Sequence, residues 1–122
     1  MTMPWGERAQ TAETAIGDLL KRLPPPIRAR AEEITLVLEK RPGRNLGVEP
    51  DILGLFEGQS LRDPDSTAVE LSPRITLFLD NILDESGPAP ATFIREVRDT
   101  YLHELGHYLG LEEDDLDLRG LA

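Results

Sequence analysis

The sequence contains no cysteine and has few basic residues. Without cysteine the chain can form no disulfide and offers no thiolate to a metal, so a metal site would need histidine and carboxylate ligands. The 13 Lys and Arg residues stand against 23 Asp and Glu, which gives a formal net charge of −10. This charge argues against nucleic acids and anionic membrane surfaces as partners, because both attract Lys and Arg.

Long apolar segments are also missing. No apolar run approaches the roughly 20 residues that a membrane-spanning helix needs. The first 20 residues contain early acids and no apolar stretch typical of a secretory signal. We therefore expect a cytoplasmic protein. A chain of 122 residues, 39% hydrophobic and 30% charged, is expected to form one domain over residues 1–122.

The two histidines of the chain lie four residues apart, in the segment His103-Glu104-Leu105-Gly106-His107. This is an instance of the zinc signature H-E-x-x-H. On a helix, residues i and i+4 share one face, so both imidazoles can reach one metal ion. Glu104 is rotated by about 100° from His103, a position that suits contact with a metal-bound water. An amphipathic helix with two surface histidines is the alternative reading of the same pattern.

A third zinc ligand is expected after this segment. The longer zincin pattern is H-E-x-x-H-x-x-G-x-x-H, and here Gly110 occupies the glycine position and Glu113 the last one. A glycine at a helix end adopts positive φ at little cost, so the chain can turn back toward the helix. Zinc accepts carboxylate oxygens, and catalytic sites keep three protein ligands. Glu113 is therefore the leading candidate, with Asp114 and then Asp117 as alternatives within an acidic run that is otherwise exposed surface.

Hydrophobic periodicity predicts two long helices and three strands. Helical spacing recurs over residues 7–23, before three prolines, and over residues 91–109. Short apolar, β-branched runs predict strands at residues 34–38, 52–56 and 74–79, and residues 58–73 read as a long loop. The second helix then carries the two histidines in its last turns. It is expected to bury four residues against the sheet while the histidines face a groove: Ile94, Val97, Leu105 and Leu109.

Three segments together resemble the small bacterial zincin-like metallopeptidases, or minimal zincins: LGLFEGQSLRD, LSPRITLFLDNI and EVRDTYLHELGHYLGLEEDDL. The resemblance implies an α+β fold, in which a small sheet of about three or more strands packs on an N-terminal helix and a long active-site helix. It implies one zinc ion per chain held by His103, His107 and Glu113, with Glu104 as catalytic base. The methionine-containing turn of metzincins cannot form, because the only methionines are Met1 and Met3.

The chemistry expected of such a site is peptide hydrolysis. Zinc lowers the pKa of a bound water to about 7, and Glu104 would take its proton. An extended peptide or unfolded segment could pair with an edge strand, either residues 53–56 or residues 75–79. Tyr101, Tyr108, Arg62 and Arg74 are candidates for oxyanion stabilisation, although packing or ion pairing explains each of them as well. A catalytically weak zinc-binding domain that acts as an interaction module, and an acidic module for a basic partner, remain open; so does the oligomeric state.

Overall fold

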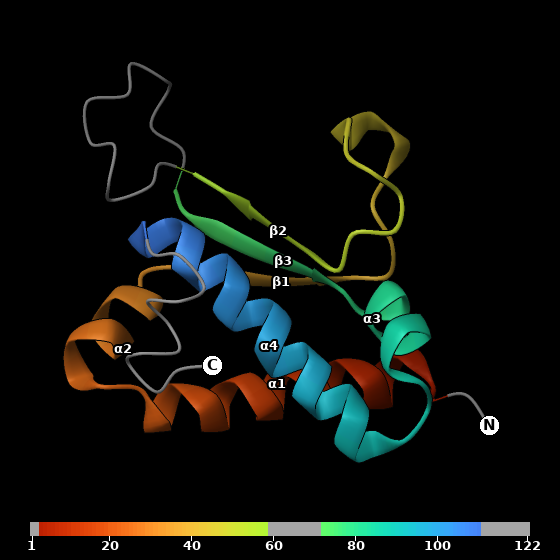
Figure 1. Ribbon diagram of the computed structural model, residues 1–122, viewed down its shortest axis with the longest axis horizontal. Helices are drawn as coiled ribbons and strands as arrows, with labels where there is room; N and C mark the ends of the chain where they lie inside the picture. Colours follow the sequence, from red (N-terminus) through yellow and green to blue (C-terminus); the bar gives the residue numbers. More distant parts are fainter. Residues whose placement is uncertain (1–2, 59–71, 111–122) are drawn as a thin grey trace.

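Two long helices and a three-stranded sheet make up this α+β protein (Figure 1). The computed structural model describes residues 3–58 and 72–110. In chain order the elements are α1 (Trp5–Arg22), α2 (Pro25–Ala31), β1 (Thr35–Glu39), the 3-10 helix η1 (Arg44–Leu46), β2 (Gly54–Glu57), β3 (Arg74–Phe78), α3 (Leu79–Ser86) and α4 (Pro90–Leu109). The predicted fold class, both long helices and all three strands are confirmed to within a few residues at their ends.

The sheet has the strand order β1-β3-β2, so β3 lies in the centre. β1 pairs with β3 in parallel, with Leu36 opposite Ile75, and β2 pairs with β3 antiparallel, with Phe56 opposite Ile75. Of the two edge-strand alternatives, residues 75–79 are therefore wrong, because β3 is paired on both sides. β2, in contrast, hydrogen-bonds to one neighbouring strand only within the described residues.

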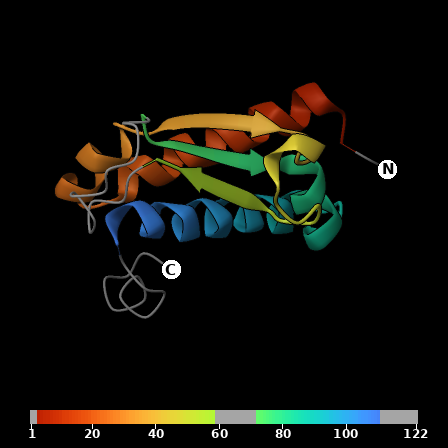
Figure 2. The same cartoon turned by 90° about the horizontal axis from the view of Figure 1, so that it is seen from above.

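The strands form one layer, and α1 and α4 form the other (Figures 1 and 2). β2 is the strand nearest to α4 in Figure 2, and α4 contacts both β2 and β3. The central strand is correspondingly apolar, and Ile75 and Leu77 are completely buried. None of the helices in residues 3–58 and 72–110 is long and apolar enough to cross a membrane.

Two short helices were not predicted. The proline cluster that follows α1 also begins α2. Proline is well tolerated in the first helical turn, because the N–H groups there form no hydrogen bond within the helix. The third strand ends one residue earlier than expected, and Leu79 begins α3 instead. Leu79 and Ile82 on this helix are completely buried, and Leu83 packs against the core. This i, i+3, i+4 pattern spans only one turn and was too short to indicate a helix by itself.

The buried face of α4 differs partly from the prediction. Val97 and Leu105 are completely buried, as expected, whereas Ile94 and Leu109 are only half-buried. Ile94 lies in a groove beside α1, not under the sheet. The reason is that α4 packs against α1 on one side and against β2 and β3 on another, so its buried surface is wider than one stripe. That surface also includes Phe93, Thr100, Tyr101, Leu102, Glu104, Gly106 and Tyr108.

Candidate metal centre

The histidine pair lies in the last two turns of α4. The helix ends at Gly110, which has the left-handed conformation (φ 70°, ψ 28°) and whose N–H bonds to the carbonyls of Gly106 and His107. A glycine reaches this conformation without the strain that a Cβ would introduce. The predicted helix end directly after the motif is thus confirmed. Residues 113, 114 and 117, the three candidates for a further ligand, lie outside the described residues.

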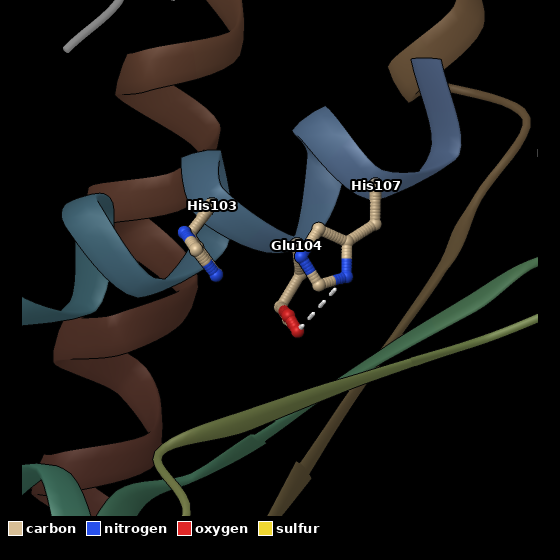
Figure 3. Close-up of side chains that lie close together, drawn as sticks. All are labelled: His103, Glu104 and His107. Carbon is tan, nitrogen blue, oxygen red and sulfur yellow. Dashed lines mark ion pairs between the residues drawn. The ribbon is translucent and has the colours of Figure 1, made fainter. Parts of the chain in front are cut away.

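His103, Glu104 and His107 come together on the side of α4 that faces the strands (Figure 3). Both histidines are exposed, and their ring centroids lie 4.8 Å apart with the rings tilted by 59°. The Glu104 carboxylate lies beside the rings, with Oε1 3.9 Å from Nδ1 of His107. The potential ligand atoms of the three residues all lie within 4.8 Å of one another. Together they could hold a metal ion.

Glu104 is the buried member of this group, with only 6% of its surface exposed. Burial raises the pKa of its carboxyl group, while the positive forms of His107 and His103 act in the opposite direction. Its Oε2 atom is buried and accepts no hydrogen bond in the structure. A buried carboxylate oxygen without a partner is costly. The site therefore fits a metal ion: two imidazoles are placed to act as ligands, and one oxygen of the carboxylate beside them has no hydrogen-bond partner among the residues that the structure describes.

Close packing between β2 and α4 buries Glu104. A Cβ placed on Gly54 would lie 2.8 Å from Cγ2 of Thr100, 3.2 Å from Cγ of Glu104 and 3.3 Å from the carbonyl oxygen of Thr76. Real side chains do not tolerate the shortest of these distances. A glycine is therefore needed where β2 crosses the helix, and its small size allows the strand to cover the carboxylate.

A groove of about 390 Å³ opens beside His103. One wall is the face of α4 that precedes the histidine pair, and the other is the segment leading into β2. The lining residues are Ile52, Leu53, Gly54, Glu96, Asp99, Thr100, His103 and Glu104. The predicted groove is thus present at His103, from which it extends toward the beginning of α4, whereas His107 is not among its lining residues.

The segment that leads into β2 and forms one wall of the groove is held by Asn81 of α3. The sequence alone did not point to this residue. Asn81 is 5% exposed, and its Nδ2 donates to the carbonyls of Pro50 and Ile52 at 2.9 and 2.8 Å. Its Oδ1 accepts from Arg41 at 2.6 Å. These bonds tie α3 to the segment that forms the groove wall. The only sequence signal was an asparagine inside the apolar run LFLDNIL, where a buried polar side chain must find partners.

Two of the four candidates for oxyanion stabilisation, Tyr108 and Arg74, have other partners. The Tyr108 hydroxyl donates a hydrogen bond to Oε2 of Glu33 at 3.2 Å. Its ring packs against that of Phe56, with 5.7 Å between the ring centroids. Arg74 forms a salt bridge with Glu57 at 2.7 Å, which agrees with the ion-pairing alternative. Burial raises the pKa of Tyr101 to about 12, so its hydroxyl remains protonated and inside the core. Arg62 lies outside the described residues.

The helix with its histidine pair, the sheet beside it and the buried glutamate can now be compared with known proteins. The family model of the zincin-like metallopeptidases matches residues 31–121. The chain belongs to this family. The match begins at the last residue of α2 and includes the whole sheet and α4, while α1 precedes it. A search among curated proteins finds no match.

Membership of the zincin-like metallopeptidase family implies a bound metal, typically zinc, and a peptide as substrate. The donor set agrees with the metal, because zinc is held in proteins by imidazole and carboxylate as well as by thiolate. Two imidazoles on one helix face meet that preference, and the chain has no cysteine that could replace them.

Proposed function

We propose that this protein is a zinc-dependent peptidase, in which His103, His107 and Glu113 hold one zinc ion and Glu104 is the general base. The observation that carries the proposal is the buried Glu104 carboxylate, which lies beside two exposed imidazoles and has one oxygen without a hydrogen-bond partner among the described residues. A site that only stabilised the fold would gain nothing from such a carboxylate. A base beside the metal, in contrast, has a role in hydrolysis.

The reaction that these residues support is attack of water on a peptide carbonyl. A bound zinc ion would lower the pKa of its water ligand to about 7 and polarise a carbonyl oxygen. Glu104 accepts the proton of the attacking water and delivers a proton to the leaving amine. Its cover by Gly54 and Thr100 keeps the carboxylate in one place, so that it need not be reordered during the reaction.

The edge of β2 that is unpaired within the described residues offers a place for the substrate. β2 lies next to α4, and the groove beside His103 is bounded by the residues that lead into this strand. An extended peptide that adds to this edge gains main-chain hydrogen bonds and passes the histidine pair. Short peptides and unfolded segments can adopt the extended conformation that such pairing requires, so we propose them as the substrate class.

One observation favours a second function, a zinc-binding domain without effective catalysis that serves as an interaction module. All residues that line the groove come from α4 and from the segment entering β2. Within the described residues, no third element contributes to the groove. Such a site would bind a peptide shallowly, and hydrolysis could be slow.

Metal content and peptide hydrolysis, measured on the same preparation, test the proposal. We expect about one zinc per chain and cleavage of peptides from a broad library. Glu104→Gln should keep the fold and the zinc but lose hydrolysis by on the order of 10²-fold or more, because the amide has the same shape and cannot accept the proton. Unchanged turnover in this variant would remove Glu104 from the mechanism. A zinc-loaded wild type that cleaves no peptide would support the non-catalytic alternative.

A further inference from the structure

The groove beside the metal centre has an acidic end. Glu96 and Asp99 line it together with His103, and on α4 they precede that histidine by seven and four residues. These spacings place all three side chains on one face of the helix. With a rise of about 1.5 Å per residue, the two acids lie roughly 6 to 10 Å from His103 along the helix axis.

The two acids are unpaired within residues 3–58 and 72–110. Neither Glu96 nor Asp99 forms a side-chain hydrogen bond or a salt bridge anywhere in the part of the chain that the structure describes. The pKa of Glu96 is raised, chiefly by burial and then by the negative charges of Asp99 and Glu85, and Arg95 offsets this only in part. The groove therefore carries negative charge that attracts a cation.

The other features of the groove indicate what form the cation takes. At one end, Glu104 lines the groove, is 6% exposed and has one carboxylate oxygen without a hydrogen-bond partner among the described residues. Along the opposite wall, Ile52 and Leu53 provide an apolar surface. A lysine or arginine side chain matches this arrangement, because its aliphatic part covers apolar surface while its charged end reaches an acid.

We propose that Glu96 and Asp99 bind a lysine or arginine side chain of the substrate and thereby set the specificity of the enzyme. This inference rests on the proposed peptidase function. An extended chain advances by about 3.3 Å per residue. The distance of the two acids from His103 then places the basic residue about two or three positions from the scissile bond, on the side that lies toward the beginning of α4.

A set of N-acetylated peptides tests this inference. The peptides are identical except for one position, which carries Lys, Gln or Glu and is moved along the sequence on both sides of the cleavage site. Acetylation removes the terminal amine as a competing cation. We expect kcat/KM for Lys to exceed that for Glu by roughly tenfold at one position, since like charges in contact are strongly disfavoured. The preference should weaken as salt is added.

Variants identify the acids responsible. The double variant Glu96→Gln with Asp99→Asn should lower the ratio of Lys to Glu cleavage rates toward one. Glu13→Gln removes one exposed carboxylate from α1, away from the groove, and should leave the ratio as it is in the wild type. A ratio that persists in the double variant would assign the preference to other residues and overturn the inference.

The outcomes separate this inference from the proposed function. If the wild type cleaves peptides through Glu104 but treats Lys and Glu alike, the inference is wrong and the function stands. If no peptide is cleaved, the same peptides are titrated against the zinc-loaded wild type. Tighter binding of the Lys peptide that the double variant loses would then support the acidic site even though the function fails. Equal Kd values would overturn the inference as well.

Discussion

Gly54 of β2 and Glu104 of α4 are packed together so closely that no side chain fits between the strand and the helix. A Cβ on Gly54 would approach Cγ of Glu104 to 3.2 Å and Cγ2 of Thr100 to 2.8 Å. The edge strand that we propose for substrate binding and the carboxylate that we propose as the base are therefore in direct contact. A change in one must move the other.

This contact predicts that Gly54→Ala destabilises the protein and impairs hydrolysis. Relief of the overlap requires Thr100, Glu104 or the strand to shift, which costs about 1–3 kcal/mol. Gly17→Ala is the matched control: Gly17 lies within α1 with nothing within 4 Å of its Cβ position, so alanine should stabilise the helix by about 0.5–1 kcal/mol. Urea unfolding of both variants measures the difference. Equal stability changes would show that the strand moves freely over the helix.

The metal assignment predicts that His103→Ala loses most of its zinc. The imidazoles of His103 and His107 lie 4.8 Å apart between ring centroids, and removal of either leaves too few protein ligands for tight binding. Arg95→Ala, an exposed change on the same helix, serves as the control and should retain the metal. Zinc per chain is measured by mass spectrometry. A His103→Ala protein with the zinc content of the wild type would disprove the assignment.

The third ligand is predicted to be Glu113. Glu113→Gln should weaken zinc binding by at least about tenfold, since even the outer partners of zinc ligands contribute that much. Asp114→Asn and Asp117→Asn are neighbouring changes of the same charge and should have small effects. The three zinc affinities are compared by competition with a chelator. If Asp114→Asn shows the largest loss instead, the ligand is the next residue along the chain.

The elements that could be predicted from the sequence are those with long or strongly patterned signals. The helical spacing over residues 91–109 and the H-E-x-x-H segment predicted a helix with both histidines exposed, and the structure agrees at His103 and His107. The short apolar runs predicted three strands, because β-branched residues favour the pleated chain. These signals are local, and each can be read within one window of the sequence.

The remaining features depend on contacts between distant segments. The groove joins residues near Leu53 to residues near Asp99, and no local pattern reports that approach. The order of the strands in the sheet could likewise not be predicted from the sequence, because β1 pairs in parallel with β3, which lies far along the chain. Asn81 donates hydrogen bonds to a segment some thirty residues earlier in the chain. Its role can therefore be seen only in the folded structure, where the two segments lie side by side.

Asn81→Ala should destabilise the groove wall. Its amide satisfies the carbonyls of Pro50 and Ile52, and loss of such buried bonds costs about 1–3 kcal/mol. Asn45→Ala removes an exposed asparagine from η1 and should be nearly neutral. Hydrogen exchange of the amides around residues 50–54 checks the effect locally, and protection there should fall in Asn81→Ala alone. Unaltered protection would show that other contacts hold this segment.

The rotation of α4 about its axis determines which of its residues reach the metal, and Leu105 reports that rotation. Leu105 lies between the two histidines in sequence but is completely buried, while both histidines are exposed. Leu105→Ala should therefore leave a cavity and cost about 2–5 kcal/mol. Leu46→Ala provides the control, because Leu46 is 42% exposed and its truncation should change the stability little. Melting temperatures of the two variants decide the matter. An unchanged melting temperature for Leu105→Ala would mean that α4 is rotated, which would turn His103 and His107 toward the core and contradict the open metal site.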